Sequence, residues 1–169
     1  MSVDRLIDSW KEVRNGLIEE ALLVPAEQFS FRATPETRSV AELLQHIVET
    51  QKVLVGETCR PDTDLMRQSV PEHIEAYAPE VKSIQDKNGL LELLRSSMDV
   101  AEATARSYAD KLGETMQRFD GKTMSKLEFL NFTVGHEMYH RGQLTVYERL
   151  LNIEPALTRR FKKLFAAAK

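Results

Sequence analysis

The chain has 169 residues and a formal net charge of −3 at pH 7, and this length favours one domain with a sizeable core. Only seven glycines and six prolines occur, so turns are scarce, which predicts a few long helices and argues against an all-β sandwich. The slightly acidic charge argues against the broad basic face that nucleic-acid binding requires. The single cysteine, Cys59, excludes an internal disulfide and a cysteine-rich zinc site.

The N-terminal stretch MSVDRLIDSWKEV carries charges every few residues, which is not the pattern of a signal peptide. No apolar run reaches the roughly 18 residues of a membrane span. We therefore expect a soluble cytoplasmic protein without a membrane partner.

Apolar residues recur at three- and four-residue steps from Val3 to Ala21, which predicts an amphipathic helix ending before Pro25. Ser39 and Glu42 form a capping box that opens a second helix. Residues 58–83 contain three prolines and little sustained pattern. We expect a long connection there, with one short helical turn.

A third helix is predicted over 88–112. The capping box of Ser125 and Glu128 opens a fourth helix, 125–152, and Pro155 suits the first turn of a short fifth helix. These elements predict an all-α fold, a four-helix bundle with a long crossover between its second and third helices. The whole chain, 1–169, is expected to form one domain.

The C-terminal tail RRFKKLFAAAK combines basic and apolar residues, as a membrane-surface helix would. Because the tail is short and the chain is acidic, we expect another arrangement. Its apolar residues should cap the bundle or form a dimer contact, while its charges stay in water.

Two of the four histidines, His136 and His140, lie four residues apart on the fourth helix and so leave the same face. The apolar pattern from Phe129 to Leu151 places both in the centre of the core-facing stripe. They are either core histidines bonded to polar neighbours or ligands of a metal ion. The metal is favoured because it satisfies two buried imidazoles economically.

The string HEMYH at 136–140 also matches the H-E-x-x-H motif of zinc metalloproteases. The following glycine is one place early for the metzincin pattern, and a valine stands where that pattern has its third histidine. The carboxylates Glu148 and Glu154 are too close to act as a downstream ligand. The peptidase reading is therefore disfavoured, and Glu137 is expected to be a solvated helix carboxylate rather than a general base.

A third ligand must then come from elsewhere, and His46 in the second helix is the best candidate. From the residues alone, His46 is either a ligand pointing between helices or an ordinary half-buried helix histidine. His73 lies in the long connection, and we expect it on the surface.

RSVAELLQHIVET, followed about ninety residues later by FTVGHEMYHRGQL, resembles the DinB superfamily of small metal-dependent proteins. The family pattern is one histidine on the second helix and an H-x-x-x-H pair, usually followed by R-G-Q, on a later helix. The resemblance covers essentially the whole chain. It implies a down-up-up-down four-helix bundle, often a homodimer, in which His46, His136 and His140 hold a divalent metal.

Three neutral imidazoles leave open positions on a metal, which is the catalytic rather than the structural pattern. Zinc or nickel is favoured, with iron or manganese as alternatives. Similar DinB proteins include thiol-dependent S-transferases and isomerases, and others are described as hydrolases. The resemblance therefore implies a metal-dependent S-transferase using a small-molecule thiol. The alternatives are a metal-dependent hydrolase, with Glu137 as its base, and a metal- or ligand-binding stress-response protein without turnover.

Four further residues lie close to the histidine pair in the sequence, and each has a structural or a functional interpretation. Gly135 and Gly142 either permit close helix packing or leave room for a ligand. Arg141 either binds an anionic group or forms a helix-surface salt bridge. Gln143 lies on the histidine face and is expected to support a ligating imidazole. Cys59 is expected to be an ordinary free thiol.

Overall fold

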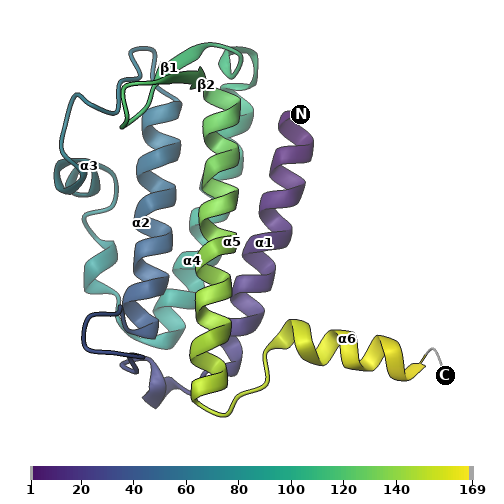
Figure 1. The fold of residues 1–169 in the computed structure, drawn as a ribbon. Helices are drawn as coiled ribbons and strands as arrows, with labels where there is room; N and C mark the ends of the chain where they lie inside the picture. The colour runs from purple at the N-terminus through teal and green to yellow at the C-terminus, as the bar shows by residue number, and fades with distance from the viewer. Residues whose placement is uncertain (1, 168–169) are drawn as a thin grey trace.

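Four long helices form the body of the computed structural model, which describes residues 2–167 (Figure 1). They are α1 (Val3–Leu23), α2 (Val40–Thr58), α4 (Lys87–Ser107) and α5 (Lys126–Leu150). In Figure 1, α1 runs downward, α2 and α4 run upward, and α5 runs downward. Each of α1 and α2 packs against both α4 and α5, so α1 and α2 lie diagonally across the bundle. The predicted down-up-up-down bundle is confirmed.

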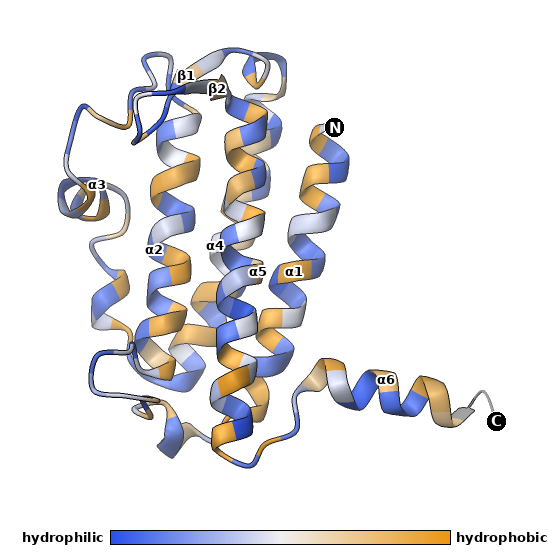
Figure 2. Ribbon diagram, viewed as in Figure 1, coloured by the Kyte–Doolittle hydropathy of each residue, from blue (hydrophilic) through white to orange (hydrophobic). Residues whose placement is uncertain are grey.

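Side-chain caps start α2 and α5 where the sequence predicts them. The Ser39 hydroxyl accepts a hydrogen bond from the backbone N–H of Glu42, whose carboxylate accepts one from the Ser39 N–H at 2.8 Å. Ser125 and Glu128 repeat this arrangement, which satisfies N–H groups that a helix start leaves unpaired. Apolar residues form one side of each long helix (Figure 2) and meet in the interior, where Trp10 is fully buried.

The long connection between α2 and α4 is more ordered than predicted. It contains the helix α3 (Val70–Tyr77) and the 3-10 turn η2 (Val81–Ser83). A third capping box, Ser69 with Glu72, starts α3. A side chain at Gly56 of α2 would lie 2.3 Å from the ring of Tyr77, so α3 packs tightly on α2.

The helix α4 ends at Ser107, five residues earlier than predicted, and the 3-10 turn η3 (Ala109–Lys111) follows. The chain then forms a small antiparallel hairpin of β1 (Thr115–Gln117) and β2 (Thr123–Ser125). The carbonyl of Leu112 accepts a hydrogen bond from the N–H of Leu127 at 2.9 Å. This bond holds residue 112 beside the start of α5. A helix α4 that continued to residue 112 would carry that residue away from α5.

The last helix, α6 (Ala156–Ala167), projects away from the bundle (Figure 1). Its first N–H groups, those of Ala156 and Leu157, donate to the buried carboxylate of Glu20 on α1, and a carboxylate suits the positive end of a helix dipole. The expectation that the apolar residues of this helix cap the bundle is wrong, because three of them are exposed: Phe161, Leu164 and Phe165. A dimer contact through them stays a prediction.

The first 3-10 turn of the chain, η1 (Ala26–Gln28), links α1 to the loop before α2. None of the helices within residues 2–167 is both long and apolar enough to cross a membrane.

An ion pair between Arg14 of α1 and Glu137 of α5 lies at the buried centre of the bundle. The Arg14 Nε donates to Glu137 at 2.9 Å, and the Trp10 indole donates to the other carboxylate oxygen at 2.7 Å. Arg14 also donates to the side chain of Gln51 on α2 and to the carbonyl of Leu94 on α4. One guanidinium group therefore binds all four long helices.

We expect Glu137→Gln to lower the free energy of unfolding by about 3–5 kcal/mol, because it leaves the Arg14 charge buried without a counter-ion. Urea denaturation measures this loss. The matched control is Glu92→Gln, since the Glu92 side chain is 74% exposed on α4 and should change stability by no more than about 0.5 kcal/mol. Equal losses in the two variants would contradict a central role for the pair.

A second buried carboxyl group, that of Glu148 near the end of α5, has no such partner. The Glu148 side chain is fully buried and neither of its oxygens forms a hydrogen bond. Burial raises the pKa of Glu148 to about 8, and the negative charge of Glu20 adds to the effect.

Because the folded chain keeps a proton on Glu148 that the unfolded chain releases near pH 4.5, stability from this residue is complete below that pH. It is lost as the pH rises towards 8. We therefore expect Glu148→Gln, which cannot ionise, to become progressively more stable than the wild type between pH 4.5 and pH 8. Unfolding midpoints of both proteins across this range measure the difference. A difference that does not change with pH would rule out the titration of Glu148.

Candidate metal centre

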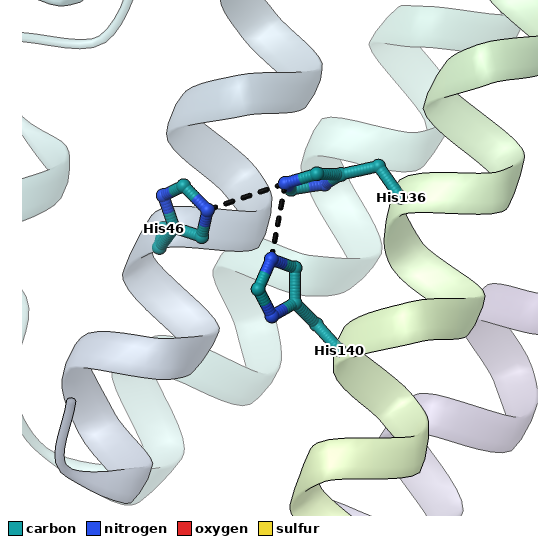
Figure 3. A group of neighbouring side chains, drawn as sticks. All are labelled: His46, His136 and His140. Carbon is teal, nitrogen blue, oxygen red and sulfur yellow. Dashed lines mark hydrogen bonds between the residues drawn. The ribbon is translucent and has the colours of Figure 1, made fainter. Parts of the chain in front are cut away.

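Three imidazole rings from two helices converge on one point (Figure 3). His46 comes from α2, and His136 and His140 come from α5. The Nε2 atom of His136 lies 3.2 Å from that of His46 and 3.1 Å from that of His140. One ligand atom from each residue lies within 4.8 Å of the others. The structure thus brings together the three histidines that the sequence singled out.

The histidine pair lies at the edge of the core rather than in its centre, contrary to the sequence-based expectation. Phe132, one turn before His136, is 49% exposed, and His136 itself is half-buried. The buried face of α5 is rotated towards α1, because Glu137 is buried in its bonds to that helix. The neighbouring His136 therefore points about 100° away from Glu137, towards α2.

Burial keeps the three imidazoles neutral near pH 7. It lowers the pKa of His46 to about 4 and that of His136 to about 3, and it also lowers the pKa of His140. The positive charge of Arg38 acts in the same direction on all three rings. A neutral imidazole offers a nitrogen lone pair, which is the form that binds metal ions.

A chain of hydrogen bonds fixes the orientation of His140. Its Nδ1 lies 3.0 Å from the Gln143 carbonyl oxygen, and the Gln143 amide donates to the Tyr147 hydroxyl at 3.0 Å. Tyr147 in turn donates to the backbone carbonyl of Arg38 at 2.9 Å. Because Gln143 offers an acceptor, His140 donates from Nδ1, and the lone pair of its Nε2 faces the cluster. The expected supporting contact from Gln143 is present.

A cavity of about 930 Å³ extends from His46 along α2. Its walls include the loop before α2, the helix α3, and Phe119 from the hairpin. This volume is in the range of small-molecule sites, which hold about 300–1,000 Å³. The buried carboxyl of Glu49, one turn after His46, also lines the cavity, and burial raises its pKa. Neither Glu49 nor Arg38 was singled out by the sequence, because nothing in the local pattern marks a cavity wall.

Glu137 of the H-E-x-x-H string is neither solvated nor directed towards the histidines. Its carboxylate is fully buried and bonded to Arg14 and Trp10. Both sequence-based readings of Glu137 are therefore wrong. The partner that buries it lies 123 residues earlier in the chain, so the local motif did not reveal it.

His73 is also placed differently from the expectation. It is fully buried rather than on the surface, because α3 packs against α2. Its Nε2 lies 3.3 Å from the carbonyl oxygen of Leu65, and its Nδ1 lies 3.5 Å from the Glu57 carboxylate. His73 is outside the three-histidine cluster.

Arg141 is engaged in the bundle, and the two glycines near the histidine pair face open space. Arg141 forms a salt bridge to Glu20 at 3.2 Å, and its guanidinium fills the space where Gly16 lacks a side chain. A Cβ atom at Gly135 or Gly142 would have no neighbour within 4 Å, so neither glycine serves close helix packing.

Cys59 behaves as the ordinary free thiol that the sequence predicts. The side chain is buried, and burial raises its pKa to about 11. A thiol with so high a pKa is a poor nucleophile at neutral pH.

Comparison with solved structures finds the same fold in several bacterial proteins. A DinB-like protein from Bacillus cereus is 17% identical, with a TM-score of 0.67 over 89% of this chain and 93% of that one. YfiT from Bacillus subtilis, described as a probable metal-dependent hydrolase with an unusual four-helix bundle topology, is 16% identical, with a TM-score of 0.69 over 90% and 89%. A mycothiol-dependent maleylpyruvate isomerase is 13% identical, with a TM-score of 0.67 over 85% of this chain and 61% of that one.

No curated protein matches the sequence significantly. The sequence model of the DinB family matches residues 1–167. The chain therefore belongs to the DinB family.

Proposed function

We propose that this protein is a metal-dependent enzyme that uses a small-molecule thiol, with His46, His136 and His140 as the ligands of one divalent ion. The observation that carries the proposal is the convergence of three Nε2 atoms, 3.1 and 3.2 Å apart, beside a cavity of small-molecule size. Zinc or nickel suits three imidazole ligands best, and iron or manganese is the alternative.

The donor set fits a metal ion on two grounds. Two nitrogens bound to one zinc ion at about 2.0–2.1 Å lie about 2.9–3.4 Å apart, for bond angles between a right angle and the tetrahedral angle. The observed separations lie inside this range. In addition, neutral imidazoles facing one another cannot satisfy every lone pair among themselves. A cation at the point where the three Nε2 atoms meet would accept those lone pairs.

A divalent ion in a three-histidine site has open positions and lowers the pKa of a thiol or water bound there. The chain contributes the orientation of His140, which Gln143 fixes, and a cavity beside His46 in which the rest of the substrate can lie. The fold is shared with a mycothiol-dependent isomerase, which supports a thiol as one substrate. Cys59 is buried with a raised pKa, so the reactive sulfur has to come from outside the protein.

Metal-dependent hydrolysis is the second candidate function. YfiT, a protein of the same fold, is described as a probable metal-dependent hydrolase. Glu137 is unsuitable as its general base because it is committed to Arg14. Glu49 favours this candidate instead, since its carboxyl group lines the cavity one helical turn after His46 and burial raises its pKa.

We expect His46→Ala to abolish stoichiometric metal binding, because two ligands on one helix cannot retain the ion through dialysis. Elemental analysis measures the metal content, and circular dichroism verifies that the bundle stays helical. The matched control is His73→Gln, which changes a histidine outside the cluster and should leave one equivalent bound. A full equivalent of metal on His46→Ala would remove His46 from the site.

We expect 2-mercaptoethanol to produce a sulfur-to-metal charge-transfer band when it is added to the cobalt-loaded protein, with one thiol bound per ion. The Cys59→Ala variant should give the same band, because the sulfur comes from the added thiol. The absence of a band with this and other small thiols would refute the thiol proposal. Ester or amide hydrolysis that Glu49→Gln abolishes would then support the hydrolase.

A further inference from the structure

Arg38 is a charged residue of the cavity that has no partner. It lies directly before Ser39, the residue that caps α2, and it lines the same cavity as His46. Among residues 2–167, its guanidinium group forms no hydrogen bond or ion pair, although its backbone carbonyl accepts one from Tyr147. The side chain is exposed, so its donors are open to solvent or to a ligand in the cavity. An arginine side chain has five N–H donors and binds carboxylates in a fixed geometry, so this position suits an anionic group.

A second arginine of the same cavity wall has a different environment. Arg32 donates to the carbonyl of Thr37 at 2.8 Å and forms an ion pair with Glu42. Its charge is already compensated, and its donors are in use. Arg32 and Arg38 therefore form a natural pair for comparison, with one guanidinium engaged within the chain and the other available.

The hydrogen-bond chain from the histidine cluster ends at Arg38. Tyr147, which receives a hydrogen bond from Gln143, donates to the Arg38 carbonyl, and Gln143 contacts His140. The backbone of Arg38 is thereby held in a fixed position relative to the three histidines. Its positive charge lowers the pKa of each of the three histidines, so the Arg38 side chain is near enough to the cluster to act on it.

The overall charge of the cavity does not by itself select anions. Three basic residues, Arg32, Arg38 and Lys82, line it together with three acidic ones, Glu27, Glu42 and Glu49. Arg32 and Glu42 neutralise each other. Burial favours the uncharged form of Glu49, which weakens its competition for the nearby cations. Lys82 is exposed and within the described residues also forms no ion pair. Its ammonium group is a point charge, whereas Arg38 offers paired, directed donors that match a carboxylate, so we assign the selectivity to Arg38.

We propose that Arg38 binds a carboxylate of the substrate, so that the cavity selects a small organic anion whose reacting group lies at the three histidines. This inference rests on the proposed function, and it specifies the substrate class. His46 follows Ser39 by seven positions along α2, a backbone rise of about 10 Å. A ligand that reaches from Arg38 to the cluster needs several atoms between its anionic group and its sulfur, and a thiol carboxylic acid meets this requirement.

The test compares 4-mercaptobutyrate with its neutral amide, 4-mercaptobutyramide, on the cobalt-loaded protein. The charge-transfer band gives a dissociation constant for each. We expect the wild type to prefer the carboxylate, and Arg38→Gln to bind it about 10- to 100-fold more weakly, as the loss of a charge-assisted contact predicts. Binding of the amide should change little. Arg32→Gln, the matched control, should retain the preference.

Three results would overturn the proposal: equal affinity of the wild type for acid and amide, an unchanged preference in Arg38→Gln, or an equal loss in Arg32→Gln. If both thiols bind without discrimination, the thiol-dependent function stands and the role of Arg38 fails. If neither thiol gives a band, the thiol function fails. Titration of the zinc-loaded protein with butyrate and butyramide, followed by the NMR signal of the Arg38 side chain, then tests the anion site alone. A shift of that signal with butyrate only supports the site, and no shift refutes it.

Discussion

The guanidinium group of Arg14 sets the arrangement on which the rest of the molecule depends. It binds Glu137 of α5, Gln51 of α2 and the Leu94 carbonyl of α4 from its own position on α1. A buried charge without such partners would destabilise the core strongly, so the four helices can adopt only rotations that keep these bonds. Because Glu137 must face α1, the adjacent His136 faces α2, where His46 lies. The buried ion pair and the histidine cluster are two consequences of one helix orientation.

This arrangement gives the H-E-x-x-H string a different role from the one it has in metalloproteases. In those enzymes the glutamate acts beside the ion. Here the two histidines and the glutamate lie on different faces of α5, and the histidines face His46 of α2, which lines the cavity. The glutamate is bonded to Arg14 and Trp10 in the core, and a different carboxyl group, that of Glu49 on α2, lines the cavity beside His46. The same five-residue pattern therefore supplies both a core ion pair and two rings of the histidine cluster.

The sequence predicted the helices well where a local signal marks them. The capping boxes of Ser39 and Ser125 defined the starts of α2 and α5 within one residue. The third box, at Ser69, lies in a segment with three prolines and a weak apolar pattern, so the local signal for α3 is poor. Local pattern also failed for Glu137 and His73, whose burial is decided by partners on other helices. A helical stripe says which residues share a face, but not which neighbouring helix that face meets.

The two Nδ1 atoms of the histidine pair, which face away from the cluster, have different environments. His140 has its Nδ1 held by Gln143, and the chain through Tyr147 continues to the start of α2. The Nδ1 of His136 is buried without a partner. A partner on the outer nitrogen fixes both the tautomer and the ring direction of a ligand. The ring of His140 is therefore oriented in the folded chain, and its bond chain also holds the backbone carbonyl of Arg38. Within residues 2–167 the Arg38 guanidinium group has no such contact, so only the histidine end of the cavity is oriented before a ligand binds.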